Sequence, residues 1–144
     1  KTCVDGQNRK RRAALSPEKK LGRGRQYNAK YKSQPGAFEL YLITHARIRN
    51  AKHYPNTDFD LTVEWVQQQF AAQEGRCFWL KVPMRLRHNS GPWQVSLDRL
   101  QLDIGYAKDN VVLTSKSANM GRMATEVGDF ELFLEDVRTS MRMI

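Results

Sequence analysis

The segment from residue 95 to residue 119 carries the pattern that most constrains the fold of this chain. One β-branched run ends at Asp98, a turn that contains Gly105 follows, and a second run opens at Asn110 and continues to Thr114. Two short β-branched runs joined by a glycine-containing turn predict a β-hairpin. Because a lone hairpin is at best marginally stable in water, it must pack against another element.

A helix is predicted directly after this hairpin. Ser115 or Ser117 can cap its first turn, which also carries Asn119. The hairpin and the helix would then bring the Asp98 carboxylate and the Asn119 amide oxygen to a common point. Mg²⁺ accepts such a set, with its other positions left to water and phosphate. The pattern therefore predicts a divalent-cation site and favours phosphodiester chemistry.

The same residues resemble the core of the HNH endonucleases, the ββα-metal or His-Me finger group, and most closely its small phage-type and homing-type members. The motifs that carry the resemblance are Ser-Leu-Asp-Arg-Leu at 96–100, Gly-Tyr at 105–106, Asp-Asn-Val-Val-Leu at 109–113, and Asn119. The resemblance covers residues 76–123, and the segment 59–84 looks like the lead-in of such proteins. It implies that Asp98 and Asn119 bind a divalent metal, Mg²⁺ or alternatively Mn²⁺, and that Asn110 supports the hairpin and orients the base.

Arg99 stands where many HNH enzymes carry the histidine that deprotonates the attacking water. An arginine keeps its proton in proteins and offers only donors, so it cannot act as an ordinary general base. It can instead hold the scissile phosphate or stabilise charge in the transition state, while a metal lowers the pKa of its bound water. His88, in a polar Gly/Pro turn, is the remaining candidate base, and a solvated loop residue is the alternative interpretation.

The net charge of +9 belongs entirely to the first 32 residues. They hold 11 of the 24 Lys and Arg residues but only two of the 15 acidic ones, so residues 33–144 are balanced. Such an arm neutralises phosphates without reading bases, which predicts nucleic acid as a partner. A solvated tail that only aids solubility is the alternative. The predicted nucleic-acid contacts are Arg9, Lys10, Arg11, Arg12, Lys19, Lys20, Arg23, Arg25 and, outside the arm, Arg122.

The arm also resembles the small zinc-binding module that precedes some HNH domains, in which paired cysteines hold the metal. Here Cys3 remains, Gly6 stands at the expected partner position, and no cysteine lies near Tyr27. Four zinc ligands cannot come from this chain alone, so we expect a degenerate module without structural zinc.

The whole pattern predicts an α+β protein: a ββα-metal core with flanking helices and an N-terminal basic extended arm. The expected boundaries are an arm at 1–35 and a domain at 36–144, divided into a helical lead-in at 36–75, the core at 76–123 and a terminal helix at 129–143.

Three helices are predicted around the core. The first covers about 37–51, with Phe38, Tyr41, Leu42 and Ile48 facing inward. The second follows the cap candidates Asp60 and Thr62, turns Val63, Val66 and Phe70 or Trp65 inward, and stops at Gly75. The third carries an apolar stripe of Phe130, Phe133, Leu134, Val137 and Met141.

Cysteine usage predicts a reducing, intracellular compartment, because Cys3 and Cys77 make no disulfide framework. We expect a cytoplasmic protein, or a mitochondrial one if a targeting peptide was removed before Lys1. No apolar run approaches the roughly 18 residues of a membrane span, so no membrane partner is expected.

The sequence therefore predicts a divalent-metal-dependent endonuclease of the HNH type that acts on DNA. The first alternative is a catalytically silent HNH-fold protein that binds RNA within a ribonucleoprotein such as a ribosome, with protein partners in the assembly. The second alternative is a DNA-binding regulator that does not cleave. The observation that best separates these hypotheses is whether a divalent ion sits between Asp98 and Asn119, as in the endonuclease, or whether RNA or protein covers that face instead.

Overall fold

The computed structural model describes residues 29–143, and the chain divides into two compact units, 1–37 and 38–144. The predicted contacts from Arg9 to Arg25 and the Cys3 motif lie outside the described residues. The described part of the first unit is a short helical turn, in which Ser33 N donates to Ala29 O at 3.1 Å.

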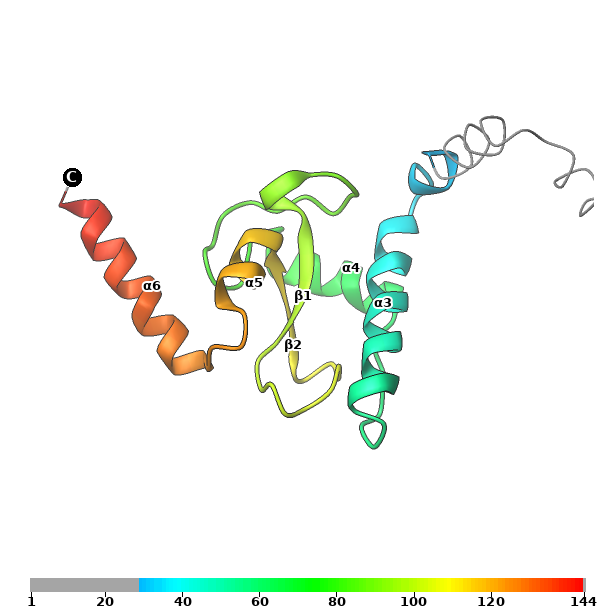
Figure 1. The fold of residues 1–144 in the computed structure, drawn as a ribbon. Coiled ribbons are helices and arrows are strands. Elements are labelled where there is room, and N and C mark those ends of the chain that lie inside the picture. The colour runs from blue at the N-terminus through cyan, green and yellow to red at the C-terminus, as the bar shows by residue number, and fades with distance from the viewer. Residues whose placement is uncertain (1–28, 144) are drawn as a thin grey trace, which may run out of the picture. The chain divides into compact units, whose positions relative to one another are not determined.

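The second unit is a mixture of helices and a two-stranded antiparallel sheet, which confirms the predicted α+β class (Figure 1). Its elements are, in chain order, α3 (Ala37–His53), α4 (Val63–Ala72), the 3-10 turn η1 (Gly91–Trp93), β1 (Val95–Arg99), β2 (Val111–Ser115), α5 (Lys116–Arg122) and α6 (Val127–Arg142). None of the helices within residues 29–143 is long and apolar enough to cross a bilayer.

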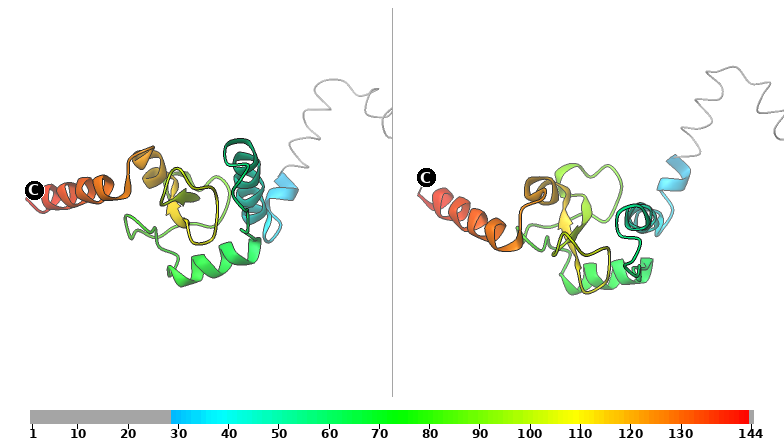
Figure 2. Two further views of the ribbon diagram at one scale, coloured as in Figure 1. Left: turned by 90° about the horizontal axis from the view of Figure 1, so that it is seen from below. Right: turned by 60° about the horizontal axis from the view of Figure 1, so that its bottom comes forward.

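The predicted hairpin and the helix that follows it are both present. Strands β1 and β2 pair with Asp98 opposite Val112, and α5 contacts both strands. The helix lies beside the hairpin in Figure 2. Ser115 ends β2 and caps α5, because its hydroxyl accepts a hydrogen bond from Ala118 N at 3.2 Å. The cap allows the chain to turn from strand into helix without an intervening loop.

Helix α3 buries a different stripe from the one that the sequence predicts. Phe38, Leu42, Ile43 and Ala46 are buried. Tyr41 and Ile48, predicted to face inward, are 42% and 59% exposed. The prediction was wrong for these two side chains because the buried residues follow each other at three- to four-residue spacing on a face of the helix that is rotated away from both of them.

Helix α4 begins directly after the predicted Thr62 cap and ends at Ala72, three positions before the predicted stop at Gly75. The Thr62 hydroxyl accepts from Trp65 N at 3.1 Å, and Gly75 follows the helix with a φ of 65°. Glycine adopts this left-handed backbone conformation more readily than other residues because it has no Cβ atom. Asp60, the other cap candidate, accepts instead from Lys108 N at 2.9 Å and so joins the loop before α4 to the loop before β2.

Helix α6 uses only part of its predicted apolar stripe. Phe130 and Leu134 are buried, and Val137 is half-buried. Phe133 and Met141 are 56% and 71% exposed, which corrects the prediction that the whole stripe packs. The buried part joins a core built from α3, α4, both strands and α5.

Candidate functional site at the hairpin and helix α5

Asp98, the predicted metal ligand, is 5% exposed and has a donor on each carboxylate oxygen. Oδ1 accepts from Arg122 Nη1 at 2.8 Å, and Oδ2 accepts from Trp79 Nε1 at 2.8 Å. Arg122 is fully buried, so the two side chains form a buried ion pair. Each oxygen thereby has the hydrogen bond that a buried charge requires.

Arg122 joins the last turn of α5 to the end of β1. Nη1 also donates to the carbonyl of Arg99, and Nη2 donates to Leu100 O at 3.0 Å. The guanidinium lies 5.2 Å from the centre of the Trp79 ring. Arg122 was predicted to contact nucleic acid, and in this structure its side chain has no exposed surface.

Asn119, the second predicted ligand, reaches the same face of β1 from one helical turn before Arg122. Its Nδ2 donates to Ser96 Oγ at 2.7 Å and to Leu97 O at 3.2 Å. Ser96 and Asp98 face the same side of the strand because side chains alternate along it. The structure therefore brings Asp98 and Asn119 to one interface between β1 and α5, where each is hydrogen-bonded to protein.

As arranged, these side chains do not fit a magnesium site. Mg²⁺ needs carboxylate oxygens open to it and keeps several waters. The Asp98 charge is already balanced by the Arg122 guanidinium, which would repel a cation placed beside it. In the range 29–143, no group of three or more His, Cys, Asp or Glu is placed to hold a metal. A metal at Asp98 would require Arg122 to move away first.

Arg99, predicted to hold the scissile phosphate, is engaged with the loop that joins the two strands. Nη1 donates to Leu102 O at 2.8 Å and to Ile104 O at 3.3 Å. Its guanidinium stacks near Tyr54 and Tyr106, at 4.7 and 5.2 Å from the ring centres. These contacts stabilise the loop, so the Arg99 guanidinium has a structural role in this arrangement.

Asn110, predicted to support the hairpin and orient the base, closes the same loop. Its Oδ1 accepts from Gln101 N at 2.8 Å, and its Nδ2 donates to Gln101 O and Gly105 O, both at 3.0 Å. All of these partners are backbone groups. Asn110 thereby fixes the path of the chain between β1 and β2.

His88, the candidate base, lies in an aromatic cluster with α3. Its ring packs edge-on against Phe38 and Tyr41, with centroids 4.8 and 5.0 Å apart. Asp98 contacts Trp79 and Arg122 instead. The structure thus places His88 and Asp98 in different surroundings.

A groove between α3 and β1 was not predicted from the sequence. Its volume is about 460 Å³, and its lining residues are Tyr41, Leu42, His45, Arg49, Gln94, Val95, Ser96, Leu97 and Lys116. Among the residues that the structure describes, the lining contains Arg49 and Lys116 and no acidic side chain. The spacing of Tyr41, His45 and Arg49, four residues apart, was the available signal because such residues share one helix face.

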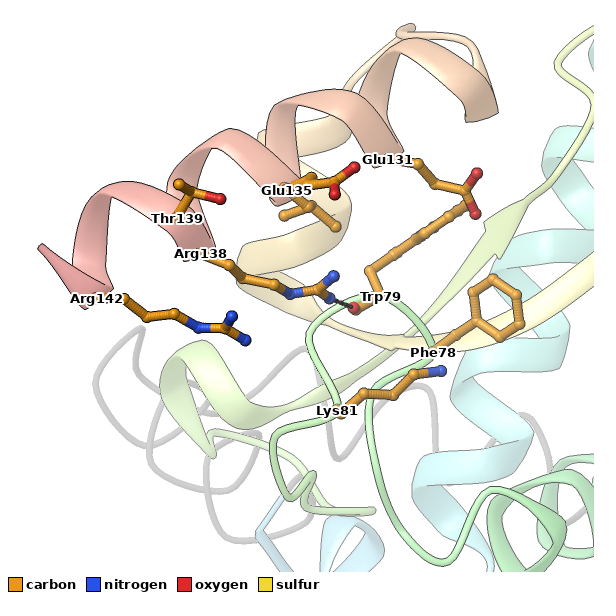
Figure 3. A pocket seen from close by; sticks show the side chains of 9 residues that line it. Phe78, Trp79, Lys81, Glu131, Glu135, Arg138, Thr139 and Arg142 are labelled. Atoms are coloured by element: carbon orange, nitrogen blue, oxygen red, sulfur yellow. Dashed lines mark hydrogen bonds between the residues drawn. The ribbon is translucent and has the colours of Figure 1, made fainter.

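A second cavity, of about 510 Å³, lies between the turn at 78–81 and α6 (Figure 3). Arg138 spans it by donating to Trp79 O at 3.0 Å. Glu131 and Glu135 share its lining with basic side chains, including Lys81. The mixed charge gives no preference for an anionic or a cationic ligand.

Cys77 sits beneath the hairpin with no exposed surface. Its sulfur lies 3.2 Å from Thr114 Oγ1 and accepts from Ser115 N at 3.2 Å and Leu80 N at 3.5 Å. Burial raises the pKa of the thiol, but the hydrogen bonds together outweigh it, so the pKa is lowered from 9.0. The thiol thus ties the turn before β1 to strand β2.

The site therefore belongs to a mixed α+β unit with a buried Asp–Arg pair between a hairpin and a helix. Comparison with protein-family models, with curated proteins and with solved structures found no match. The resemblance to HNH endonucleases accordingly stays a prediction from the motifs.

Proposed function

We propose that this chain is a nucleic-acid-binding protein with an HNH-like ββα core whose Asp98–Arg122 pair is structural. The observation that carries the proposal is that both Asp98 oxygens are occupied, one by a buried guanidinium and one by an indole N–H. This is the noncatalytic alternative raised by the sequence. It accounts for the hairpin and α5 without a metal between them.

Charge supports nucleic acid as the partner. All of the +9 excess falls within residues 1–32, and the rest of the chain is balanced. A concentrated positive charge of this kind attracts phosphates and releases their counterions, which gives affinity without sequence selectivity. The binding experiment shows whether the preferred nucleic acid is DNA or RNA.

Fluorescence anisotropy with a labelled oligonucleotide, at several salt concentrations, tests this proposal. A variant with Arg9, Lys10, Arg11 and Arg12 all changed to Gln should bind more weakly. Its slope of log affinity against log salt should fall by roughly 0.7 to 0.9 for each phosphate that the variant no longer neutralises.

The matched control removes four charges from the folded unit. It changes Lys52, Arg87, Lys108 and Arg142 to Gln, all of them exposed. The control should keep most of the salt dependence. Equal weakening in both variants would mean that overall charge matters and the segment 1–32 does not.

The second candidate function is the metal-dependent endonuclease. It is favoured by one observation, that Asp98 and Asn119 reach the same β1–α5 interface. It requires the Asp98–Arg122 pair to open when substrate and metal bind. Nicking of supercoiled plasmid in Mg²⁺ or Mn²⁺, abolished by Asp98→Ala and by chelation, would establish it.

A further inference from the structure

The groove between α3 and β1 combines positive charge with an exposed aromatic ring. Arg49 comes from α3, and Lys116 is the first residue of α5. Because none of the lining residues within 29–143 is acidic, no carboxylate from that part of the chain neutralises either cation in the groove. Two cations from different elements, facing one hollow, favour an anionic ligand.

The fold orients the Arg49 guanidinium and fixes the backbone from which the Lys116 side chain extends. Arg49 Nε donates to His45 O at 3.4 Å, and its guanidinium lies 5.6 Å from the centre of the Tyr106 ring. Lys116 N donates to Gln94 O at 2.7 Å, which fixes the start of α5 beside β1. A preorganised charge loses less entropy when it binds phosphate than a freely rotating one.

Tyr41 supplies the aromatic surface of the groove. It is 42% exposed, and its ring centroid lies 4.3 Å from that of His45. Nucleic-acid bases stack on such rings whatever their sequence, but only when they are unpaired. At about 460 Å³, the groove falls in the size range of sites for small ligands, which suits a nucleotide unit of one strand.

We propose that the α3–β1 groove binds single-stranded nucleic acid, with phosphates at Arg49 and Lys116 and a base against Tyr41. This inference rests on the proposed function, since it names the part of the folded unit that takes the strand. The basic segment supplies general attraction, and the groove supplies the preference for unpaired bases.

Binding of the full chain to a labelled single-stranded 12-mer tests the proposal, with DNA and RNA versions and a duplex of the same sequence. Lys116→Gln and Arg49→Gln should each weaken single-strand binding about fivefold in 0.1 M salt, because each phosphate contact contributes about 0.7 to the salt slope. Tyr41→Ala should weaken it roughly 5- to 100-fold and leave duplex binding nearly unchanged. Lys108→Gln, which removes one exposed charge outside the groove, is the control.

The outcomes separate the two proposals. No binding of either strand type by the full chain would overturn the proposed function and this inference together. Binding that the groove variants weaken no more than Lys108→Gln does would overturn the groove alone. Circular dichroism and thermal melting establish that each variant is folded.

Photocrosslinking gives a measurement that does not depend on variants. An oligonucleotide with 5-iodouridine at each position in turn should crosslink to Tyr41 or His45, as read by mass spectrometry of the tryptic peptides. Crosslinks confined to residues 1–32 would overturn the groove as a binding site even if affinity is high.

Discussion

Arg122 Nη1 lies 2.8 Å from Asp98 Oδ1, and the two side chains are 0% and 5% exposed. The pair connects the end of α5 to the end of β1 at the position where the sequence motif implies a metal. A guanidinium and an indole N–H supply the positive charge and the donors that the carboxylate needs when it is removed from water. The carboxylate is thereby used to hold the hairpin to its helix.

Arg122→Met should destabilise the protein strongly. The change leaves the Asp98 carboxylate buried without its counter-charge, which costs about 3 to 5 kcal/mol of unfolding free energy. Chemical denaturation measures the decrease. Arg142→Gln, at an exposed arginine near the end of α6, is the control and should change the unfolding free energy by less than about 0.5 kcal/mol.

The double variant Asp98→Asn with Arg122→Met extends this test. Because it removes both charges, it should be more stable than Arg122→Met alone, and the coupling should exceed about 1 kcal/mol. Strictly additive single and double variants would mean that the two groups do not interact in solution.

Asn110→Ala should also destabilise the protein, through the loop between the strands. It deletes the side chain that bonds Gln101 N, Gln101 O and Gly105 O. At about 1 kcal/mol for each hydrogen bond, the unfolding free energy should fall by roughly 2 to 4 kcal/mol, including the effect of buried backbone groups left without partners. Asn56→Ala, at an exposed loop residue, is the control, and equal effects of the two changes would contradict this role for Asn110.

Local signals in the sequence predicted the hairpin, the Ser115 cap and the Thr62 cap, because each depends on residues a few positions apart. The Asp98–Arg122 pair could not be predicted this way. Its partners are 24 residues apart, and the Trp79 indole comes from a third segment. The motif predicted that Asp98 and Asn119 meet at one point. The structure places both between β1 and α5, but the contacts of each side chain depend on tertiary packing. Tertiary packing also explains why the prediction for Tyr41 was wrong. Helical periodicity placed its side chain in the core, whereas in the structure it lines the groove.

Divalent metal should neither stabilise nor activate the protein if the ion pair is structural. A ligand that binds only the folded state increases the free energy of unfolding, by about 2.7 kcal/mol when its concentration is 100 times its dissociation constant, and so raises the melting temperature. We therefore expect no shift in melting temperature with 10 mM Mg²⁺ or Mn²⁺, and no nicking of plasmid that chelation removes. A metal-dependent rise in melting temperature that Asp98→Ala abolishes would show that Asp98 binds the metal and would contradict a purely structural ion pair.

The stability contributed by Cys77 should increase with pH. The folded state lowers the pKa of its thiol from 9.0 because hydrogen bonds from Thr114, Leu80 and Ser115 outweigh the effect of burial. A lowered folded pKa means that the folded state releases the proton more readily than the unfolded chain, so this stabilisation is fully present above pH 9.0 and is lost as the pH falls through the folded pKa. The difference in unfolding free energy between wild type and Cys77→Ala should therefore widen from pH 7 to pH 9.5, as measured by urea denaturation. A difference that stays constant or narrows over that range would show that the hydrogen bonds do not favour the thiolate.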